Sequence, residues 1–307
     1  MNFQQLRIIR EAVQRNFNLT DVAAALFTAQ SGVSKHIKDL EDELGVELFV
    51  RRGKRLLGLT EPGRELAVIV DRMLIDAKNI KRLAEQFAGA DAGRLTIATT
   101  HTQARYALPQ VVARFKAAFP KVHLVLHQGS PAEIVALLQS GEADIGIATE
   151  ALEGVRQFVT FPFYNWHHAV VVPEGHALAD LPTLSLEALA EHPLITYHEG
   201  YTGRARIDAT FSAAGLNPDI VMSALDADVI KTYVQVGLGV GILAAMAFEP
   251  LRDVGLRLLP GAHLFSENTT HIAVLRGHYL RGYAYRFLQE CICELTEDQV
   301  KRAISAE

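Results

Sequence analysis

The sequence predicts three parts: an all-α head, one long linking helix and a larger α/β body built as two lobes. Residues 1–60 carry short helical patterns, residues 61–90 carry one unbroken heptad pattern, and the remainder alternates short apolar runs with helical periodicity. With 307 residues, of which 49% are hydrophobic, the chain is long enough for more than one core.

Charge is unevenly distributed along the chain, although the net charge is only −5. Residues 1–58 carry nine Lys or Arg against seven Asp or Glu, whereas residues 94–307 carry sixteen against twenty-two. A slightly basic head on an acidic body indicates two separate tasks, and the overall negative charge argues against a protein that coats nucleic acid over its whole surface.

Cysteine usage and the N-terminus indicate the compartment. The two cysteines, Cys291 and Cys293, are too few for a disulfide framework or a zinc site, and we expect ordinary thiols. The first residues, MNFQQLR, lack the apolar core of a secretory signal, and no stretch approaches the roughly 20 uninterrupted apolar residues of a membrane span. We therefore expect a cytoplasmic protein with no membrane partner.

The head is expected to contain a first helix followed by a pair of short helices. Thr20 can cap a helix over residues 21–26, and a second helix over residues 30–44 is ended by Gly45. The first helix has three apolar residues on one face: Leu6, Ile9 and Val13. The last helix has an apolar stripe spaced 4, 3 and 4: Val33, Ile37, Leu40 and Leu44.

Polar and basic side chains gather at the start of the last helix of the head and in the segment that follows it. Short apolar runs flank Gly53, which suggests a basic hairpin whose charges suit phosphate contacts. A simpler alternative is a pair of helices followed by a solvated basic turn. However, two short helices, donor side chains and a basic hairpin occur together here. This combination favours a winged helix-turn-helix over residues 1–60 that binds double-stranded DNA. The candidate contacts are Thr28, Gln30, Ser31, Ser34, Lys35, Lys38, Arg51, Arg52 and Lys54.

Residues 61–90 are expected to form a linker and dimerisation helix. Thr60 can cap it, Pro62 is tolerated in its first turn, and no breaker follows until Gly89. A heptad seam runs along it: Leu66, Val70, Met73, Ala77, Ile80, Ala84 and Phe87. One apolar stripe could also pack on its own chain, but the length of the run beside a DNA-binding head favours a homodimer.

Residues 91–307 read as alternating strands and helices. Strands are expected at about 95–99, 122–127 and 144–149, and the pattern resumes after residue 160, which implies parallel sheets in two lobes. We assign residues of about 94–160 and 268–295 to the first lobe and about 161–267 to the second. Ligands bind such sheets beyond the carboxyl ends of the strands, so the body is expected to hold a ligand between its lobes.

Hydroxyl and amide donors follow the first strand of the body, in the stretch ATTHTQARY at residues 98–106. A helix begins there, so its free N–H groups could bind an anion together with these side chains. Similar groups follow other strands, although threonine also favours strands and Ser or Thr favours helix caps. The candidate ligand donors are Thr100, Thr102, Gln103, Ser130, Thr149 and Thr202. His167 and His168, next to Trp166, could also line the cleft between the lobes.

No catalytic, cofactor or metal motif stands out. The spacing of glycines 237, 239 and 241 is not that of a dinucleotide-binding loop, and close backbone packing explains it better. His123 and His127 lack a third metal ligand, and no nucleophile elbow or carboxylate pair is evident. We therefore expect neither an enzyme, a resident cofactor nor a metal. A solute-binding transport component is disfavoured by the basic head.

Taken together, these motifs resemble the family of LysR-type transcriptional regulators. The stretch AQSGVSKHIKDLEDELGVELFVR in the head is strongly typical of that family, and the resemblance covers nearly the whole chain. It implies a winged helix-turn-helix, a long linker helix and a two-lobed effector domain like that of periplasmic binding proteins. It also implies a homotetramer, assembled as a dimer of dimers, that bends promoter DNA, with RNA polymerase as a further partner.

Within that family the body is similar to the CysB group, through the stretches TTHTQARY, HQGSP, GEADIGIATE and GLGVGI. This implies control of cysteine biosynthesis and sulfur assimilation, with N-acetylserine or O-acetylserine as inducer and sulfate or thiosulfate as further anions. The implied ligand donors are Thr100, Thr102, Gln103, Thr149 and Thr202, with Trp166 nearby. The stretches MNFQQL, FVRRGKRLLG and WHH are instead similar to Cbl-type members, which implies the alternative of organosulfur and sulfonate use with adenosine phosphosulfate as effector.

Overall fold

The computed structural model describes residues 1–53, 55–88 and 92–306 of the chain. The chain divides into two compact units. The N-terminal unit comprises Met1–Ala84 with Gly277–Tyr279, and the C-terminal unit comprises Glu85–Arg276 with Leu280–Glu307. Lys54, one of the candidate DNA contacts, lies outside the described residues.

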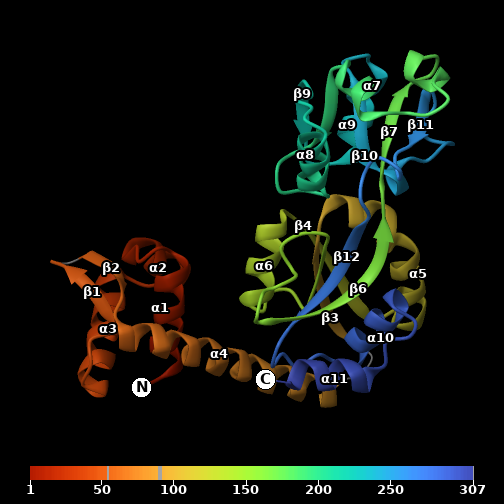
Figure 1. Cartoon of the computed structure of the whole chain (residues 1–307). Coiled ribbons are helices and arrows are strands. Elements are labelled where there is room, and N and C mark those ends of the chain that lie inside the picture. Colours follow the sequence, from red (N-terminus) through yellow and green to blue (C-terminus); the bar gives the residue numbers. More distant parts are fainter. Residues whose placement is uncertain (54, 89–91, 307) are drawn as a thin grey trace. The chain divides into compact units, whose positions relative to one another are not determined.

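The N-terminal unit is helical apart from one hairpin (Figure 1). Its elements are α1 (Phe3–Gln14), α2 (Leu19–Ala25), α3 (Gln30–Leu44), β1 (Phe49–Arg52), β2 (Arg55–Leu59) and α4 (Glu61–Ala88). The hairpin strands pair antiparallel, with Arg52 opposite Arg55 at the tip. The predicted winged helix-turn-helix followed by a long helix is therefore confirmed.

Local capping sets the ends of these helices. Asn2 forms a capping box with Gln5 at the start of α1, and Gly45 ends α3 in the left-handed conformation at φ +70°. The prediction that Thr20 caps α2 is wrong, because Asn18 accepts the Thr20 N–H and the helix begins two residues earlier than expected. Asparagine is as good an N-cap as threonine, so the motif was present but misplaced.

The core of the head uses most of the predicted apolar stripe. Val33, Ile37 and Leu40 on α3 are buried together with residues of α1 and α2. Leu44 and Val13, which the spacing placed on the same faces, are exposed instead. Both lie at the C-terminal end of their helix.

The long helix α4 has two different halves. Thr60 accepts the N–H of Gly63 at 3.1 Å, as expected for its N-cap. Val70 is buried in the core of the head, and Leu66 and Met73 pack against that core, so the first part of the heptad seam packs on its own chain. Further along, Ile80 and Phe87 are exposed. The alternative that the stripe packs on its own chain therefore holds for the first half alone.

The first lobe of the C-terminal unit is built on a five-stranded sheet of order β4-β3-β5-β12-β6. The strands are β3 (Gly93–Thr99), β4 (Val122–Gln128), β5 (Ile145–Ala148), β6 (Phe158–Trp166) and β12 (Asn268–Leu275). β3 runs parallel to β4 and β5, and β12 runs antiparallel to β5 and β6. The helical segments are η1 (Gln103–Ala107), α5 (Leu108–Ala118), α6 (Pro131–Gln139), α10 (Gly282–Cys291) and α11 (Glu297–Ser305).

The second lobe repeats this plan with a sheet of order β11-β7-β10-β8-β9. Its strands are β7 (His168–Pro173), β8 (Leu194–Tyr197), β9 (Ile220–Ala224), β10 (Val240–Ala244) and β11 (Leu256–Pro260). β8 runs parallel to β9 and β10, and β7 runs antiparallel to β10 and β11. The helical segments are η2 (Ala177–Asp180), α7 (Leu186–Ala190), α8 (Arg204–Ala213), α9 (Ala227–Gln235) and η3 (Ala245–Ala247).

The glycines of the VGLGVGIL stretch serve packing within this second lobe. A Cβ on Gly241 would lie 2.8 Å from Val234 of α9, and a Cβ on Gly239 would lie 2.4 Å from the carbonyl oxygen of Pro193. Both contacts are closer than real Cβ atoms allow, so glycine permits the close approach of α9 and of the loop before β8. The packing interpretation of these glycines is confirmed.

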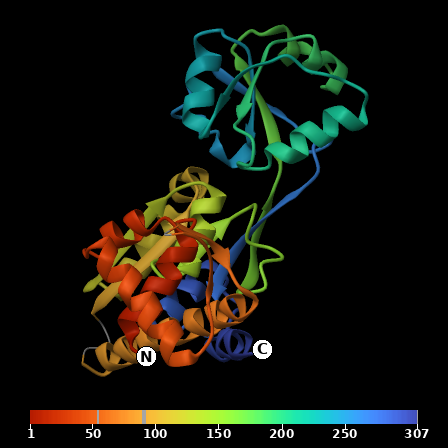
Figure 2. The same ribbon diagram turned by 90° about the vertical axis from the view of Figure 1, so that its left-hand side faces the viewer.

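Two chain segments connect the lobes, one from β6 to β7 and one from β11 to β12 (Figure 2). β6 pairs with β12 along its whole length, from Phe158 opposite Leu275 to Trp166 opposite Asn268. The predicted lobe boundary at residue 160 is therefore about six residues too early, since the first lobe continues to Trp166. The polar and aromatic residues of FVTFPFYNW concealed this strand in the sequence.

The C-terminal end of the chain also differs from the prediction. The first lobe was expected to end at about residue 295, but α10 ends at Cys291 and a second helix, α11, begins after the capping box of Thr296 and Gln299. Val300 and Ile304 of α11 are buried in the core of the first lobe, which therefore extends past residue 295.

None of the helices in the described part of the chain is long and apolar enough to cross a membrane.

Candidate functional site

The carboxyl ends of β3 and β5 form the floor of the candidate ligand site. The hydroxyl of Thr99 donates to the carbonyl of Ile147 at 3.0 Å and so ties the two strands together where they end. The chain then enters a helix whose first part, Gln103–Ala107, is π-helical. π-Helical turns are rare and are found frequently at functional sites.

Thr270 on β12 organises the polar side chains at this place. Its hydroxyl oxygen lies 3.3 Å from Gln103 Nε2, 3.3 Å from the Thr149 hydroxyl and 3.1 Å from Trp166 Nε1. The Tyr164 hydroxyl donates to the other end of the Gln103 amide. Two of the predicted donors, Gln103 and Thr149, are thus brought together with Trp166. They are held by one threonine that the sequence did not single out.

Two further predicted donors, Thr100 and Thr102, lie buried at the start of the same helix. The hydroxyl of Thr102 is shielded from solvent and has no well-formed hydrogen bond among the described residues. A buried hydroxyl without a partner is uncommon in proteins, and a bound ligand or water often completes one where it occurs. The Thr102 hydroxyl does interact with the buried Tyr197 hydroxyl, and this contact opposes the rise that burial causes in the pKa of the tyrosine. Thr102 can donate to a ligand if it gives up this contact.

The second lobe contributes a backbone loop before α8. Thr202 has φ +43° and Gly203 has φ +74°, so two consecutive residues adopt the left-handed conformation. His168 Nε2 is hydrogen-bonded to the carbonyl of Thr202 at 3.1 Å. The side-chain amide of Asn268 contacts Nδ1 of the same histidine at 3.4 Å. Thr202, a predicted donor, is buried here. The N-cap residue of α8 is Gly203, which has no side chain with which to cap the helix.

Glycine is required at position 203. A Cβ there would lie 2.6 Å from His168 Cε1 and 2.7 Å from Asn268 Oδ1. The N–H of Gly203 donates to the carboxylate of Glu150, which follows β5 in the other lobe. Burial raises the pKa of Glu150, and hydrogen bonds from the backbone oppose this effect.

His168 is held neutral at the centre of this arrangement. Burial lowers its pKa to about 4, because the charged imidazolium would lose its hydration between Trp166 and Phe265. A neutral ring that donates from Nε2 to Thr202 must accept at Nδ1, which matches the amide N–H of Asn268. His168 thus positions the loop of the second lobe from the start of β7.

Ser130 is not joined to this cluster by any hydrogen bond that the structure describes. Its hydroxyl accepts the N–H of Glu133 at 3.2 Å and donates to the carboxylate of the same residue at 2.9 Å. These contacts form the capping box of α6 and give Ser130 a structural role. The hydrogen bonds of Glu133 with Ser130 lower the pKa of the glutamate.

A second group of contacts joins the lobes beside the donor cluster. Tyr106 donates to Asp228 of α9 at 2.6 Å, and Lys231 lies 3.2 Å from the same carboxylate. Arg105 lies 3.7 Å from Asp228 and 3.5 Å from Glu249. These neighbours lower the pKa of Asp228 although burial opposes them. The helical segment η1, which follows β3, therefore contacts the second lobe through Arg105 and Tyr106.

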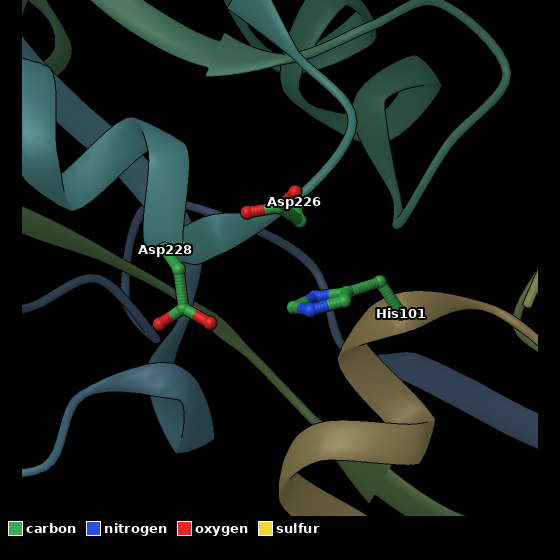
Figure 3. Close-up of side chains that lie close together, drawn as sticks. All are labelled: His101, Asp226 and Asp228. Carbon is green, nitrogen blue, oxygen red and sulfur yellow. The ribbon is translucent and has the colours of Figure 1, made fainter.

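His101 lies next to this group and faces Asp226 and Asp228 (Figure 3). The nearest nitrogen and carboxylate oxygens of the three residues lie within 4.8 Å of one another. Asp226 caps α9 by accepting the Val229 N–H at 2.9 Å, and Asp228 is neutralised by Lys231. Both carboxylates are thus already engaged, which favours an interlobe contact over a cation site.

The head presents the predicted DNA-contacting residues at the start of α3. Gln30, Ser31, Lys35 and Lys38 are exposed, and Thr28 and Ser34 are half-buried. The N-cap residue of α3 is Ala29, which offers no side chain to the first N–H groups of the helix. Free N–H groups at a helix start suit a phosphate, and the exposed donors beside them suit base edges.

The hairpin after α3 carries Arg51 and Arg52. Arg51 Nη2 is 2.5 Å from Glu41 Oε2, and Glu41 also accepts the backbone N–H groups of Leu48 and Phe49. Arg51 is therefore partly committed to fixing the hairpin on α3. Arg52 at the tip is exposed.

Sequence reasoning did not place Thr270, Tyr164, His168 or Glu150 among the candidate site residues. The first three lie on β12, β6 and β7, the strands that lead from one lobe to the other. Glu150 directly follows the predicted donor Thr149, and this position in the sequence was the one indication that it lies at the site. The others are far away in the sequence: Thr270 is 167 residues from Gln103.

Comparison with known families identifies both parts of the chain. Residues 3–64 match the model described as "Bacterial regulatory helix-turn-helix protein, lysR family". Residues 88–295 match the model described as "LysR substrate binding domain". Together the two matches cover the head and almost all of the two-lobed unit.

Curated relatives match over the full length. The transcriptional regulator SsuR of Burkholderia cenocepacia is 57% identical over 98% of this chain and 97% of its own length. Cbl of Escherichia coli is 54% identical over 99% of this chain and 96% of its own, and CysB of Burkholderia cenocepacia is 50% identical over 100% and 98%. All three are transcriptional regulators, which excludes the enzyme alternative.

Among solved structures, the cofactor-binding domain of the Cbl transcriptional regulator superposes with a TM-score of 0.68 at 49% identity. It covers 70% of this chain and 95% of that domain. The predicted two-lobed fold and the predicted resemblance are both confirmed. The chain belongs to the LysR family of helix-turn-helix transcriptional regulators.

Proposed function

We propose that this regulator controls genes of cysteine biosynthesis and sulfur assimilation in response to a small anionic effector bound between its lobes. The observation that carries the proposal is the similarity over the full length to SsuR, Cbl and CysB. The donor cluster around Thr270 and the buried Thr102 hydroxyl support the effector site.

The effector would be N-acetylserine or O-acetylserine, with sulfate or thiosulfate as simpler anions. Thr102 and Thr100 would bind it directly, Gln103 and Thr149 would line the site from the Thr270 cluster, and Thr202 would approach from the second lobe. Trp166 would lie beside it. Ser130 contributes less, since its hydroxyl is engaged in the capping box of α6.

Adenosine phosphosulfate is the alternative effector, and it would make the protein a regulator of organosulfur and sulfonate use. The observation that favours it is the order of identities, because Cbl of Escherichia coli at 54% exceeds CysB of Burkholderia cenocepacia at 50%. The phosphosulfate group would meet the same donors as a carboxylate or sulfate.

DNA binding would proceed through α3 and the hairpin of two or more heads. The exposed second half of α4, with Ile80 and Phe87, would form the dimer contact, and two dimers would form a tetramer. The chain would then act at promoters together with RNA polymerase. The effector would shift the population of lobe arrangements and thereby the placement of the paired heads.

Titration of the full chain tests the effector site. The chain has one tryptophan, Trp166, so its fluorescence reports events beside Thr270. N-acetylserine, O-acetylserine, sulfate, thiosulfate and adenosine phosphosulfate are compared by calorimetry and fluorescence. Thr102→Ala is expected to weaken the true effector at least about tenfold, because it removes a donor with no other well-formed hydrogen bond among the described residues.

Thr210→Ala on α8 serves as the matched control, since its hydroxyl donates to the carbonyl of Arg206 and is exposed. Unchanged effector binding in Thr102→Ala would refute the site assignment. Preference for an acetylserine assigns the protein to cysteine biosynthesis, and preference for adenosine phosphosulfate assigns it to organosulfur use.

Selection of duplexes from a random pool tests the DNA interface. Lys35→Ala at the start of α3 is expected to weaken binding to the selected duplex about tenfold or more and to leave effector affinity unchanged. Lys121→Ala, in the exposed turn before β4, is the control. Equal DNA affinity of both variants would contradict the assignment of α3.

A further inference from the structure

Glu150 occupies a position that the proposed site does not explain. It follows Thr149 at the carboxyl end of β5 and is the carboxylate that meets Gly203 from the opposite lobe. Every other group that the site is proposed to use, Thr100, Thr102, Thr149 and the Gln103 amide among them, can donate a hydrogen bond. An anion site that also contains a partly buried carboxylate needs a reason, because like charges repel strongly where water is excluded.

One oxygen of Glu150 has a clear role. Oε1 accepts the N–H of Gly203, the N-cap residue of α8, whose own side chain cannot cap the helix. Glu150 therefore supplies the missing cap from the other lobe, and its charge suits the positive end of a helix. Arg206, one turn into α8, adds a favourable charge.

The other oxygen has no role within the described residues. Oε2 is shielded from solvent and forms no well-formed hydrogen bond among them, although the backbone N–H groups of Glu150 and Thr202 lie near enough to the carboxylate to oppose the rise in its pKa. A charged oxygen without a partner is costly, so native proteins rarely leave one unless a ligand, water or ion completes it. The ring of His168 faces the carbonyl of Thr202 and the amide of Asn268, so it does not complete this oxygen.

We propose that Glu150 is a specificity-determining residue, which caps α8 with one oxygen and offers the other to a hydrogen-bond donor on the effector. This inference rests on the proposed function, since it concerns the ligand of the same site. The site then selects a compound that carries an N–H or O–H group beside its anionic group. It discriminates against a bare oxyanion such as sulfate, which has acceptors alone and is repelled by the carboxylate.

Two small anions test this requirement directly. Sulfate and hydrogen phosphate are both tetrahedral dianions at about pH 8, but hydrogen phosphate carries one O–H donor. Calorimetric titration of the full chain is expected to give at least about tenfold tighter binding of hydrogen phosphate, since hydrogen bonds to charged groups contribute that much. Glu150→Gln removes the charge and keeps an oxygen for the Gly203 N–H. It is expected to raise sulfate affinity about tenfold and to abolish the preference.

Glu153→Gln is the matched control, because this nearby side chain is 73% exposed and its loss of charge should change neither affinity. Equal affinities of the two anions for the wild type, or an unchanged preference in Glu150→Gln, would overturn the proposal. The wild-type comparison decides the matter even if Glu150→Gln does not fold.

The two proposals fail in different ways. Anion binding that is lost in Thr102→Ala but shows no preference for the donor-bearing anion rejects the role of Glu150 and keeps the site. Absence of binding for both anions at about 50 mM, where a site of about 1 mM affinity is saturated, overturns the site and the role of Glu150 together.

Discussion

The two lobes share one strand order, but the hydrogen-bonding groups at the ends of their strands differ. In the first lobe, the ends of β3 and β5 carry side-chain donors that are held in place by hydrogen bonds to Thr270. In the second lobe, the loop before α8 presents a backbone N–H, and its shape is set by two left-handed residues, Thr202 and Gly203. One lobe thus offers side chains and the other offers main chain.

This difference determines how each half of the site can fail. A side-chain donor is lost by substituting one residue, and the loss is local. Among the twenty amino acids only proline lacks a backbone N–H, so any other substitution removes this donor only by displacing the loop that presents it. The second lobe should therefore be sensitive to the backbone conformation at Gly203 and to the charge of His168, which contacts the loop. The first lobe should be sensitive to the loss of the Thr270 hydroxyl.

The largest effect is expected from Gly203→Ala. The left-handed conformation costs an alanine about 1–2 kcal/mol, and the new Cβ would meet the buried ring of His168 at 2.6 Å. Together with overpacking, the free energy of unfolding should fall by about 4 kcal/mol. Urea unfolding of the full chain, followed by Trp166 fluorescence, measures this change in the two-lobed unit.

Gly215→Ala separates the two causes. Gly215 has φ +70°, but a Cβ there would meet nothing within 4 Å. It should therefore lose only the conformational part, about 1–2 kcal/mol. If both variants lost the same amount, the tight packing of Gly203 on His168 would not matter and the loop would be freer than proposed.

The next effect is a dependence of stability on pH through His168. Its pKa is lowered to about 4 in the folded protein, from 6.5. The unfolded chain therefore binds a proton first as the pH falls, so stability is fully present above about pH 6.5 and is lost as the pH falls through 4. The loss attributable to this buried ring should reach about 3 kcal/mol.

His168→Gln provides the comparison, because glutamine can still donate to the Thr202 carbonyl but does not titrate. The difference in free energy of unfolding between wild type and variant, measured from about pH 7.5 to about pH 4, should shrink as the pH falls. Parallel curves for the two proteins would mean that His168 is solvated and does not hold the loop as described.

The same contrast between lobes explains what the sequence could and could not predict. The strands β3, β4 and β5 were predictable because short apolar runs alternate with helices, and the donors Thr102 and Gln103 were predictable because they follow β3. Gly203 was recognisable only as part of a loop before a helix. Its need for glycine comes from His168 and Asn268, which reach it through the strands that connect the lobes.

Thr270 was unpredictable for the same physical reason. It is the second residue of TTHIAVLRG, a stretch typical of an ordinary strand, and its hydroxyl meets its partners only when β12 lies beside β5 and β6. Pairing between strands distant in the sequence depends on the whole fold, which local patterns do not encode. The assignment of individual ligand and DNA contacts accordingly stays a prediction.

The smallest of the three effects concerns this threonine. Thr270→Val keeps the shape of the side chain but leaves Trp166 Nε1, Gln103 Nε2 and the Thr149 hydroxyl without their shared partner. Unsatisfied buried donors should lower the free energy of unfolding by about 2 kcal/mol. Thr196→Val in the second lobe is the matched control, because its hydroxyl makes one bond, to the Ile242 carbonyl at 2.9 Å, and its loss should cost about 1 kcal/mol. Equal losses in urea unfolding would mean that Thr270 is one buried threonine among others, whereas a larger loss together with weaker effector binding would establish it as the centre that holds the side-chain donors of the first lobe in place.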